Sequence, residues 1–313
     1  HFAPVNVKAV FVNPIDYRVR SGSEQLDARL LVLGYDASGI VEDVGEDITL
    51  FKKGDEVIYA GVLGRQGSNA SHQLVGERIV AIKPNTWTHE DAAALPLVSL
   101  TAWEGLIENL GIPISETENP KSLLYVPTTH SVGSLALTLA SKVLKLKTIM
   151  ATASRPATIA WVKKFGATHV INHNLPFSLP SVHYRLNVVS DRCPPSPLRS
   201  LCGGSTEKNV AAPVPLINPT GNISLIVPVE CPLPFQDAFY KAVSLHWIFM
   251  FTKPLTDTRP ETQGQILKEI AVLADSGVIS RYNVTESHVF GEAALKSAHE
   301  SGKAIGKIVL VRA

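Results

Sequence analysis

The spacing of hydrophobic and polar positions changes near residue 90. Before it, short runs of β-branched residues are separated by glycine, proline and acidic turns, a pattern typical of a compact β-barrel-like unit. The expected strands span 5–12, 38–45, 54–61, 72–75 and 79–82. Asn13-Pro14 ends the first of them, because proline cannot donate to a strand ladder.

After residue 90 the pattern becomes that of a parallel sheet. Helices are expected over 90–95 and 100–110, and then strands at 122–126, 148–152 and 169–172 alternate with helices over 132–144 and 157–165. This alternation predicts right-handed βαβ units and a doubly wound sheet. The proline-rich residues 174–220 predict one strand, at 186–190. The last expected elements are a strand at 221–227, helices over 263–276 and 291–301, and a strand at 307–311.

Composition narrows the class of protein. A chain of 313 residues suggests about two domains. Lys and Arg number 29 against 28 Asp and Glu, so the near-neutral chain has no electrostatic reason to bind nucleic acid or an anionic membrane. Three cysteines exclude a disulfide framework and a four-cysteine zinc lobe. Without a membrane-span pattern or signal-peptide pattern, we expect a cytoplasmic protein.

Two adjacent βα turns carry candidate nucleotide chemistry. The first reads Val126-Pro-Thr-Thr-His-Ser-Val-Gly-Ser134, where a pyrophosphate site would need several glycines and Gly133 is the one present. Its place between a strand and a helix favours nucleotide binding, and its composition equally allows a packed turn without a ligand. The second turn ends in Ser154-Arg155, a hydroxyl beside a guanidinium, which suits a 2′-phosphate. A solvated arginine at a helix start is the alternative.

Several ordered motifs resemble the medium-chain dehydrogenase/reductase superfamily. They are Asn13-Pro-Ile-Asp16, Gly34-Tyr-Asp-Ala-Ser-Gly-Ile-Val41, Lys53-Gly-Asp-Glu-Val57, the segment 95–104, Thr152-Ala-Ser-Arg155 and the segment 301–307. The chain is most similar to the zinc-independent, quinone-oxidoreductase-like branch, often labelled zinc-type alcohol dehydrogenase-like. The resemblance covers almost the whole chain and is weakest over 174–220.

The resemblance implies an α/β architecture of two interleaved domains. A GroES-like β-barrel catalytic domain would comprise residues 1–102 and 256–313, and a Rossmann NADP-binding domain with a doubly wound parallel sheet would comprise 103–255. It also implies NADPH as cofactor, a homodimer, and hydride transfer to a small molecule such as a quinone, an enone, an enoyl thioester or an intermediate of secondary metabolism.

The resemblance also implies site residues. Thr101 would lie beside the nicotinamide, Ser131, Val132, Gly133 and Ser134 would hold the pyrophosphate, Ser154 and Arg155 would hold the 2′-phosphate, and His173 and Lys303 would lie near the cofactor. Asn13 and the segment 246–251, with Trp247, Phe249 and Phe251, would line the substrate side. A core strand would carry the same aromatic residues.

Zinc chemistry is not expected. Zinc-dependent relatives place a Cys near position 13 and a His-Glu pair at 35 and 36, where this chain has Asn13, Tyr35 and Asp36. Without the Cys and His ligands a tetrahedral site cannot be built. A substrate carbonyl would then need hydrogen-bond donors, and Asn13, Tyr17 and Tyr59 are the catalytic candidates by position.

The glycine-poor turn motivates a second hypothesis. Side chains at 128–131 take space that the pyrophosphate approach requires. The fold would then serve a cofactor-independent catalyst, such as a cyclase, or a non-catalytic partner. The Ser154-Arg155 pair favours the reductase, because a redox-inactive protein has little need of a 2′-phosphate clamp.

Overall fold

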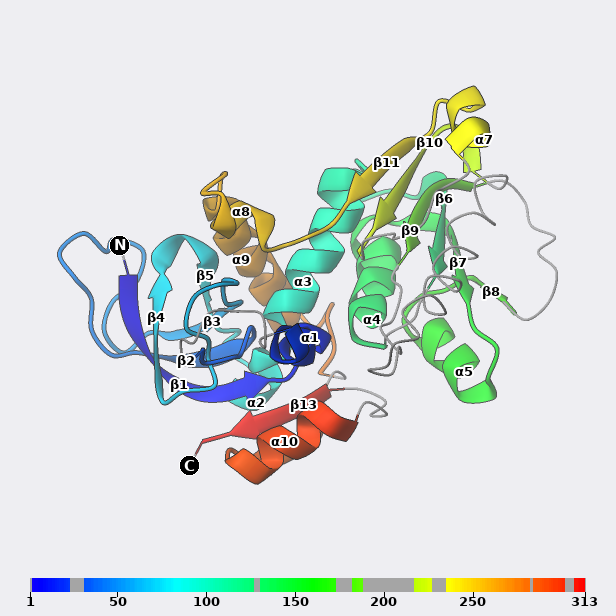
Figure 1. The fold of residues 1–313 in the computed structure, drawn as a ribbon. Coiled ribbons are helices and arrows are strands. Elements are labelled where there is room, and N and C mark those ends of the chain that lie inside the picture. The colour runs from blue at the N-terminus through cyan, green and yellow to red at the C-terminus, as the bar shows by residue number, and fades with distance from the viewer. Residues whose placement is uncertain are drawn as a thin grey trace. The chain divides into compact units, whose positions relative to one another are not determined.

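The chain divides into two compact units. A computed structural model describes residues 2–22, 31–126, 130–172, 182–187, 217–226, 235–281, 284–301 and 307–312. One unit is made of His1–Leu100 and Met250–Ala313, and the other of Thr101–Phe249 (Figure 1). The C-terminal segment therefore returns to the N-terminal unit.

The first unit is built on a sheet whose described strands follow the order β12-β13-β1-β2-β3-β5, with β4 pairing with β1. Its strands are β1 (Phe2–Phe11), β2 (Ala37–Val41), β3 (Glu56–Tyr59), β4 (His72–Gly76), β5 (Val80–Ile82), β12 (Val284–Val289) and β13 (Lys307–Val311). β1 is long enough to pair antiparallel with β13, β2 and β4. Alternate β1 residues, such as Val5 and Val7, enter a core with Val57 and Leu310, as the period of two in a strand requires.

Helices of this unit connect and cover the strands. They are α1 (Pro14–Gly22), α2 (His89–Ala93), α3 (Pro96–Trp103), α8 (Thr252–Leu255), α9 (Glu261–Asp275) and α10 (Glu292–Ser301), with the short turn η2 (Glu77–Ile79). The helix expected over 100–110 starts earlier, because Pro96 is well suited to a first helical turn. It continues into the second unit through η3 (Glu104–Asn109).

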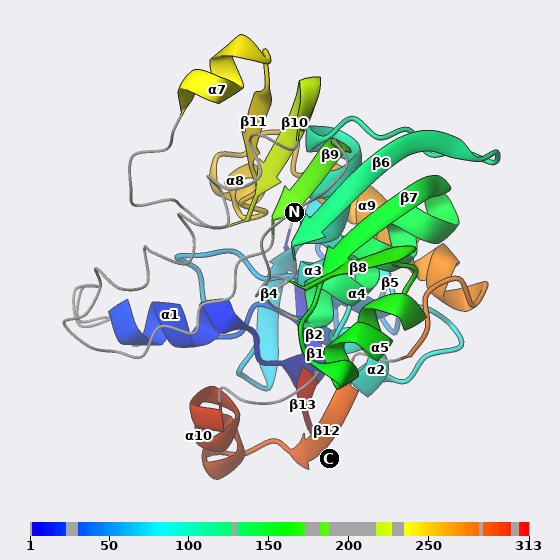
Figure 2. The ribbon, with the colours of Figure 1, turned by 90° about the vertical axis from the view of Figure 1, so that its right-hand side faces the viewer.

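The second unit is a parallel sheet in the order β11-β10-β9-β6-β7-β8 (Figure 2). The strands are β6 (Asn119–Val126), β7 (Leu146–Thr152), β8 (His169–Ile171), β9 (Val182–Asn187), β10 (Ile217–Leu225) and β11 (Ser244–Trp247). Between them lie α4 (His130–Thr138) with its continuation η4 (Leu139–Val143), α5 (Pro156–Lys164) and α7 (Phe235–Tyr240). The predicted α/β fold, with a GroES-like unit and a doubly wound sheet, is confirmed.

The strand order of the second unit reverses beside β6. The chain runs from β6 outward to β7 and β8, and then returns to place β9 on the other side of β6. Two connections that leave a parallel sheet in opposite directions open a crevice at the carboxyl ends of their strands, which is where such sheets bind ligands. The predicted strand at 186–190 lies earlier, at β9, and the one at 221–227 also begins earlier, at Ile217.

Candidate functional site

Asn13 and Asp36 form a buried hydrogen-bonded pair, which lies where β1 ends and its antiparallel neighbour β2 begins. Asn13 follows β1 and Asp36 precedes β2, and the register that pairs Val10 with Ala37 brings the two side chains together. The Asn13 Nδ2 donates to Asp36 Oδ2 at 2.8 Å. Asp36 Oδ1 accepts the backbone N–H of Leu97, in the first turn of α3, at 2.7 Å. The pair therefore joins β1, β2 and α3 through one carboxylate.

Asp16 and Tyr35 adjoin this pair. Asp16 Oδ2 accepts the backbone N–H of Asn13 at 2.7 Å and so fixes the first turn of α1. The pKa of Asp16 is raised to about 7, chiefly by burial and also by the charge of Asp36, against a lowering by the hydrogen bond from the Asn13 N–H. Burial and the charge of Asp16 raise the pKa of Tyr35 to about 12. Asp16 thus titrates near neutral pH, while Tyr35 keeps its proton.

The donor set at positions 13, 35 and 36 does not fit zinc. The Asn13 amide points an N–H at Asp36, and both Asp36 oxygens accept hydrogen bonds from protein groups. Tyr35 is fully buried and its ring packs edge-on against Phe251, with 5.5 Å between centroids. Zinc needs deprotonated sulfur, imidazole or carboxylate ligands in a tetrahedron. Over the described ranges, no three His, Cys, Asp or Glu side chains gather closely enough to hold a metal ion.

The two tyrosines predicted as donors occupy different surroundings. Tyr17 lies on α1, one turn after Asn13, and is half-buried. Burial raises its pKa, and Arg18 lowers it. Tyr59 ends β3 inside the hydrophobic core, where burial raises its pKa strongly. Tyr17 is therefore the better placed of the two to meet a substrate, and the catalytic role of each stays a prediction.

The three aromatic residues expected at the substrate side divide between the units. Phe251 belongs to the first unit and is buried against Tyr35. Trp247 ends β11 in the second unit, and half of its surface is exposed, as is half of Phe249. Phe251 thus contacts Tyr35, which precedes Asp36 in the chain.

Gly133 is needed for packing between a helix and a strand. It lies in α4, and a Cβ at this position would be 2.3 Å from the hydroxyl oxygen of Tyr125, on β6. The same helix directs the Ser134 hydroxyl inward, where it accepts from Trp161 Nε1 at 2.8 Å. Ser131 and Val132 form the first turn of α4. Sequence reasoning missed the Tyr125 contact, although Tyr125 is the one aromatic residue of β6 and was a visible signal.

Ser154 and Arg155 lie at the carboxyl end of β7, next to β6 in the sheet. Arg155 is exposed and precedes α5, whose first turn is closed by Thr158 Oγ1 donating to the Arg155 carbonyl at 2.8 Å. The pair is therefore at the carboxyl edge of the sheet, next to the point where the strand order reverses. Thr101 is buried in α3. His173 and Lys303 lie outside the described residues.

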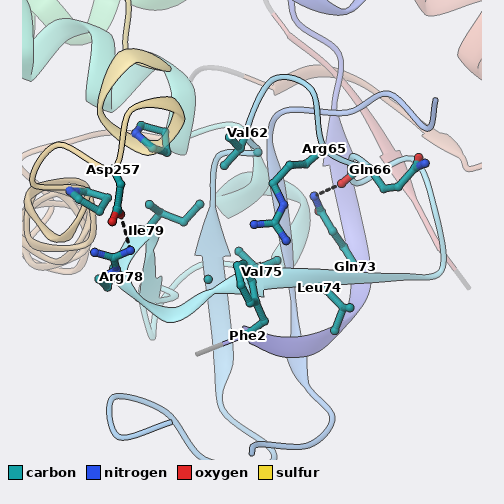
Figure 3. A pocket seen from close by; sticks show the side chains of 14 residues that line it. Phe2, Val62, Arg65, Gln66, Gln73, Leu74, Val75, Arg78, Ile79 and Asp257 are labelled. Atoms are coloured by element: carbon teal, nitrogen blue, oxygen red, sulfur yellow. Dashed lines mark hydrogen bonds and ion pairs between the residues drawn. The ribbon is translucent and has the colours of Figure 1, made fainter. Parts of the chain in front are cut away.

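A separate pocket occurs in the first unit, beside β4 (Figure 3). The Arg65 guanidinium lies 4.1 Å above the ring centroid of Phe2, and Arg78 pairs with Asp257 at 2.5 Å. None of the predicted site residues lines this pocket. We therefore take the Asn13–Asp36 pair as the candidate site of this unit.

Across the described residues, no helix has the length and apolar character of a membrane span.

Comparisons with known proteins match this picture. The model of the alcohol dehydrogenase GroES-like domain matches residues 3–85. A zinc-type alcohol dehydrogenase-like protein of Staphylococcus aureus (strain COL) is 34% identical over 98% of this chain and 89% of its own length. Human mitochondrial NAD(P)H oxidoreductase RTN4IP1 is 30% identical over 98% of this chain and 80% of its own length.

A solved structure extends the similarity. A candidate zinc-dependent alcohol dehydrogenase from Rhizobium etli CFN 42 has a TM-score of 0.85 and 38% identity over 99% of this chain and 89% of that one. The similarity therefore spans both units and the whole order of elements.

Proposed function

Because the chain belongs to the medium-chain dehydrogenase/reductase superfamily of oxidoreductases, we propose that it is an NADPH-dependent reductase that transfers a hydride, without zinc, to a quinone, an enone or an enoyl-type substrate. The cofactor, the substrate class and the absence of zinc are the parts of this statement that go beyond membership of the superfamily.

The position of Arg155 carries the cofactor proposal. The residue follows β7, which is adjacent to β6, so it lies at the carboxyl edge of the sheet next to the strand that precedes α4. A helix start binds a pyrophosphate through its backbone N–H groups, and a neighbouring Arg binds a 2′-phosphate by charge-assisted bonds. Ser154, half-buried beside it, would add a hydroxyl. This combination supports NADPH over NADH.

The residues of the first unit would then handle the substrate. NADPH, when bound, supplies the hydride. An amide nitrogen carries two protons, so Asn13 Nδ2 can donate one to Asp36 and direct the other at a substrate carbonyl oxygen. Tyr17 keeps its proton at neutral pH and can donate it as negative charge develops on that oxygen. Phe251 and Tyr35 would exclude water from the same place.

We also propose that two copies associate through β11. This strand ends the described sheet of the second unit, and the exposed side chains of Trp247 and Phe249 accompany it. An uncovered strand edge with large apolar side chains favours pairing with another chain. Trp247→Ser should lower the apparent mass in light scattering from dimer to monomer, whereas a wild-type monomer at micromolar concentration would contradict the proposal.

The glycine-poor turn favours a second candidate function. Side chains at 128–131 take space that the close approach of a pyrophosphate requires. The fold would then serve a cofactor-independent reaction, or no reaction. Direct binding of NADPH separates the two candidates.

Titration with NADPH, followed by its fluorescence, is the decisive experiment. We expect micromolar binding that falls about tenfold or more in Arg155→Ala, because a charge-assisted bond contributes about 1.5–3 kcal/mol. NADH affinity should not change. Lys163→Ala, at the other end of α5, removes a charge from the same helix and should bind NADPH as the wild type does. No binding at millimolar NADPH would contradict the reductase.

A further inference from the structure

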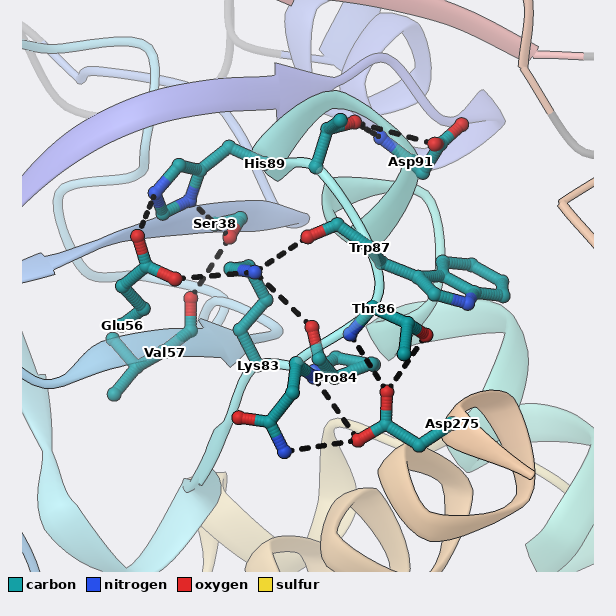
Figure 4. A network of polar contacts seen from close by, with 12 residues as sticks. Ser38, Glu56, Val57, Lys83, Pro84, Thr86, Trp87, His89, Asp91 and Asp275 are labelled. Atoms are coloured by element: carbon teal, nitrogen blue, oxygen red, sulfur yellow. Dashed lines mark hydrogen bonds and ion pairs between the residues drawn. The ribbon is translucent and has the colours of Figure 1, made fainter. Parts of the chain in front are cut away.

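Four polar side chains, those of Ser38, His89, Glu56 and Lys83, form a connected network in the first unit (Figure 4). Ser38 Oγ is 2.7 Å from His89 Nδ1 and 3.0 Å from the carbonyl oxygen of Val57. His89 Nε2 is 3.3 Å from one oxygen of Glu56, whose other oxygen is 3.1 Å from Lys83 Nζ. Lys83 also donates to the carbonyl oxygens of Pro84 and Trp87. This network joins α2 to strands β2 and β3.

The order Ser38–His89–Glu56 is that of a hydrolase triad, but its burial excludes that chemistry. Ser38 is fully buried, and its hydroxyl is directed at a strand carbonyl. A nucleophilic serine has to reach a substrate carbon. The network of Ser38, His89, Glu56 and Lys83 therefore has a structural role within the protein.

Counting protons distinguishes two states of His89. If the ring is neutral and donates from Nε2 to Glu56, Ser38 has to give its one proton to Nδ1, and the Val57 carbonyl loses that bond. If the ring is protonated, Nδ1 donates to Ser38, Ser38 donates to Val57, and Nε2 donates to Glu56. The imidazolium satisfies all three contacts together, whereas the neutral ring satisfies two.

The charged surroundings of His89 set where this change occurs. Burial lowers the pKa of His89, Glu56 raises it, and Lys83 and, less strongly, Lys8 on β1 lower it. The strands β12 and β13 also contact α2. On β12, Glu286 and His288 pair with each other at 3.3 Å, and Arg312, directly after β13, lies over the ring of Phe290. The His89 imidazolium therefore loses its proton at a pH below 6.5, the ordinary pKa of histidine.

His89 is linked to the candidate site by continuous hydrogen-bonded backbone. Leu95 N donates to Ala92 in α2 at 3.1 Å, and Ser99 N donates to Leu95 at 2.9 Å, so α2 runs directly into α3. The first turn of α3 presents Leu97 N to Asp36. Ser38 lies on β2, two residues after Asp36. Two structural routes, one through α2 and α3 and one through β2, therefore connect His89 with Asp36.

We propose that His89 is a positioning residue whose protonation sets the geometry of the Asn13–Asp36 pair. Its imidazolium fastens α2 to β2 and β3 and thereby holds Leu97 N on Asp36. The consequence for catalysis rests on the proposed reductase function, but the structural coupling does not.

The coupling can be tested by NMR titration of the full chain between pH 4.5 and 8. The ring resonances of His89, the Leu97 amide and the Asn13 side-chain amide should move with one midpoint, below 6.5. In His89→Asn, which keeps a donor near Ser38 but does not titrate, the Leu97 shift should vanish. A Leu97 amide that stays fixed while His89 titrates in the wild type would overturn the proposal, whether or not His89→Asn folds.

Two variants serve as matched controls. Asp16→Asn removes a second carboxyl group beside Asn13, and His72→Asn removes an exposed His–Glu pair of the same unit, with 3.1 Å between His72 and Glu42. The Leu97 shift should persist in both. Its loss in Asp16→Asn, or its persistence in His89→Asn, would assign the shift to another group and overturn the proposal.

Activity gives an independent readout. The kcat/KM of NADPH oxidation should change by up to about tenfold across the His89 midpoint, since small displacements of a positioned group are costly. This step should be absent in His89→Asn. A coupled Leu97 shift in a protein without NADPH oxidation would support the positioning role and contradict the proposed function alone.

Discussion

The side-chain amide of Asn13 donates to the carboxylate of Asp36 across 2.8 Å, and both residues are buried. They are 23 positions apart in the chain and stand where zinc-dependent relatives are expected to place metal ligands. An amide–carboxylate hydrogen bond, extended to the backbone of Leu97, thus joins β1, β2 and α3.

Removing the Asn13 amide should destabilise the protein. In Asn13→Ala, Asp36 Oδ2 loses its donor while remaining buried, which costs about 3 kcal/mol of unfolding free energy for a charged group. Urea denaturation measures the loss. Asn6→Ala, a control on β1 whose amide makes a long 3.4 Å contact with Glu42, should change stability by less than about 0.5 kcal/mol. Equal effects of the two substitutions would contradict the role of the pair.

Asp16 should make stability depend on pH. The unfolded carboxyl loses its proton near 3.8, while the folded one retains it to about 7. The folded state therefore binds more protons between these values, and its stability falls as pH rises through this window. Asp16→Asn has no carboxyl group to titrate, so its unfolding free energy should not fall in this window. Between pH 4 and 8 it should therefore become more stable relative to the wild type by a few kcal/mol, since each unit of pKa difference corresponds to about 1.4 kcal/mol. Parallel stability curves for the two proteins would contradict the prediction.

A methyl group at position 133 should clash with Tyr125. We expect Gly133→Ala to cost about 1–3 kcal/mol and to lower the melting temperature, because the added Cβ meets the Tyr125 hydroxyl. In a Tyr125→Val background the cost should shrink, since the ring is gone. Gly45→Ala, where a Cβ would meet no atom within 4 Å, is the control. An undiminished cost in the Tyr125→Val background would contradict the contact.

Metal removal should leave the protein unchanged. Because the donors at positions 13, 35 and 36 do not fit zinc, treatment with a chelator should alter neither the melting temperature nor the rate of NADPH oxidation. Elemental analysis of purified protein provides the direct measurement. Zinc in a one-to-one ratio with the chain would contradict the interpretation of this site.

The sequence by itself determined the order and type of the elements and the family. Periods of two and 3.6 are properties of neighbouring residues, so they mark strands and helices locally, and the motifs around Asn13, Gly34 and Leu95 indicated the superfamily that the relatives confirm. The turn at Ser154-Arg155 also falls at the strand end where the pattern put it.

Only the tertiary structure decided which residues meet. Strand register brings Asn13 to Asp36, the packing of α4 on β6 brings Gly133 to Tyr125, and the placement of α2 over β2 and β3 joins Ser38, His89 and Glu56. These pairs are separated by 8 to 51 positions, and no local pattern specifies them. Their contacts arise from burial of side chains from several elements in common cores, which a linear sequence does not display.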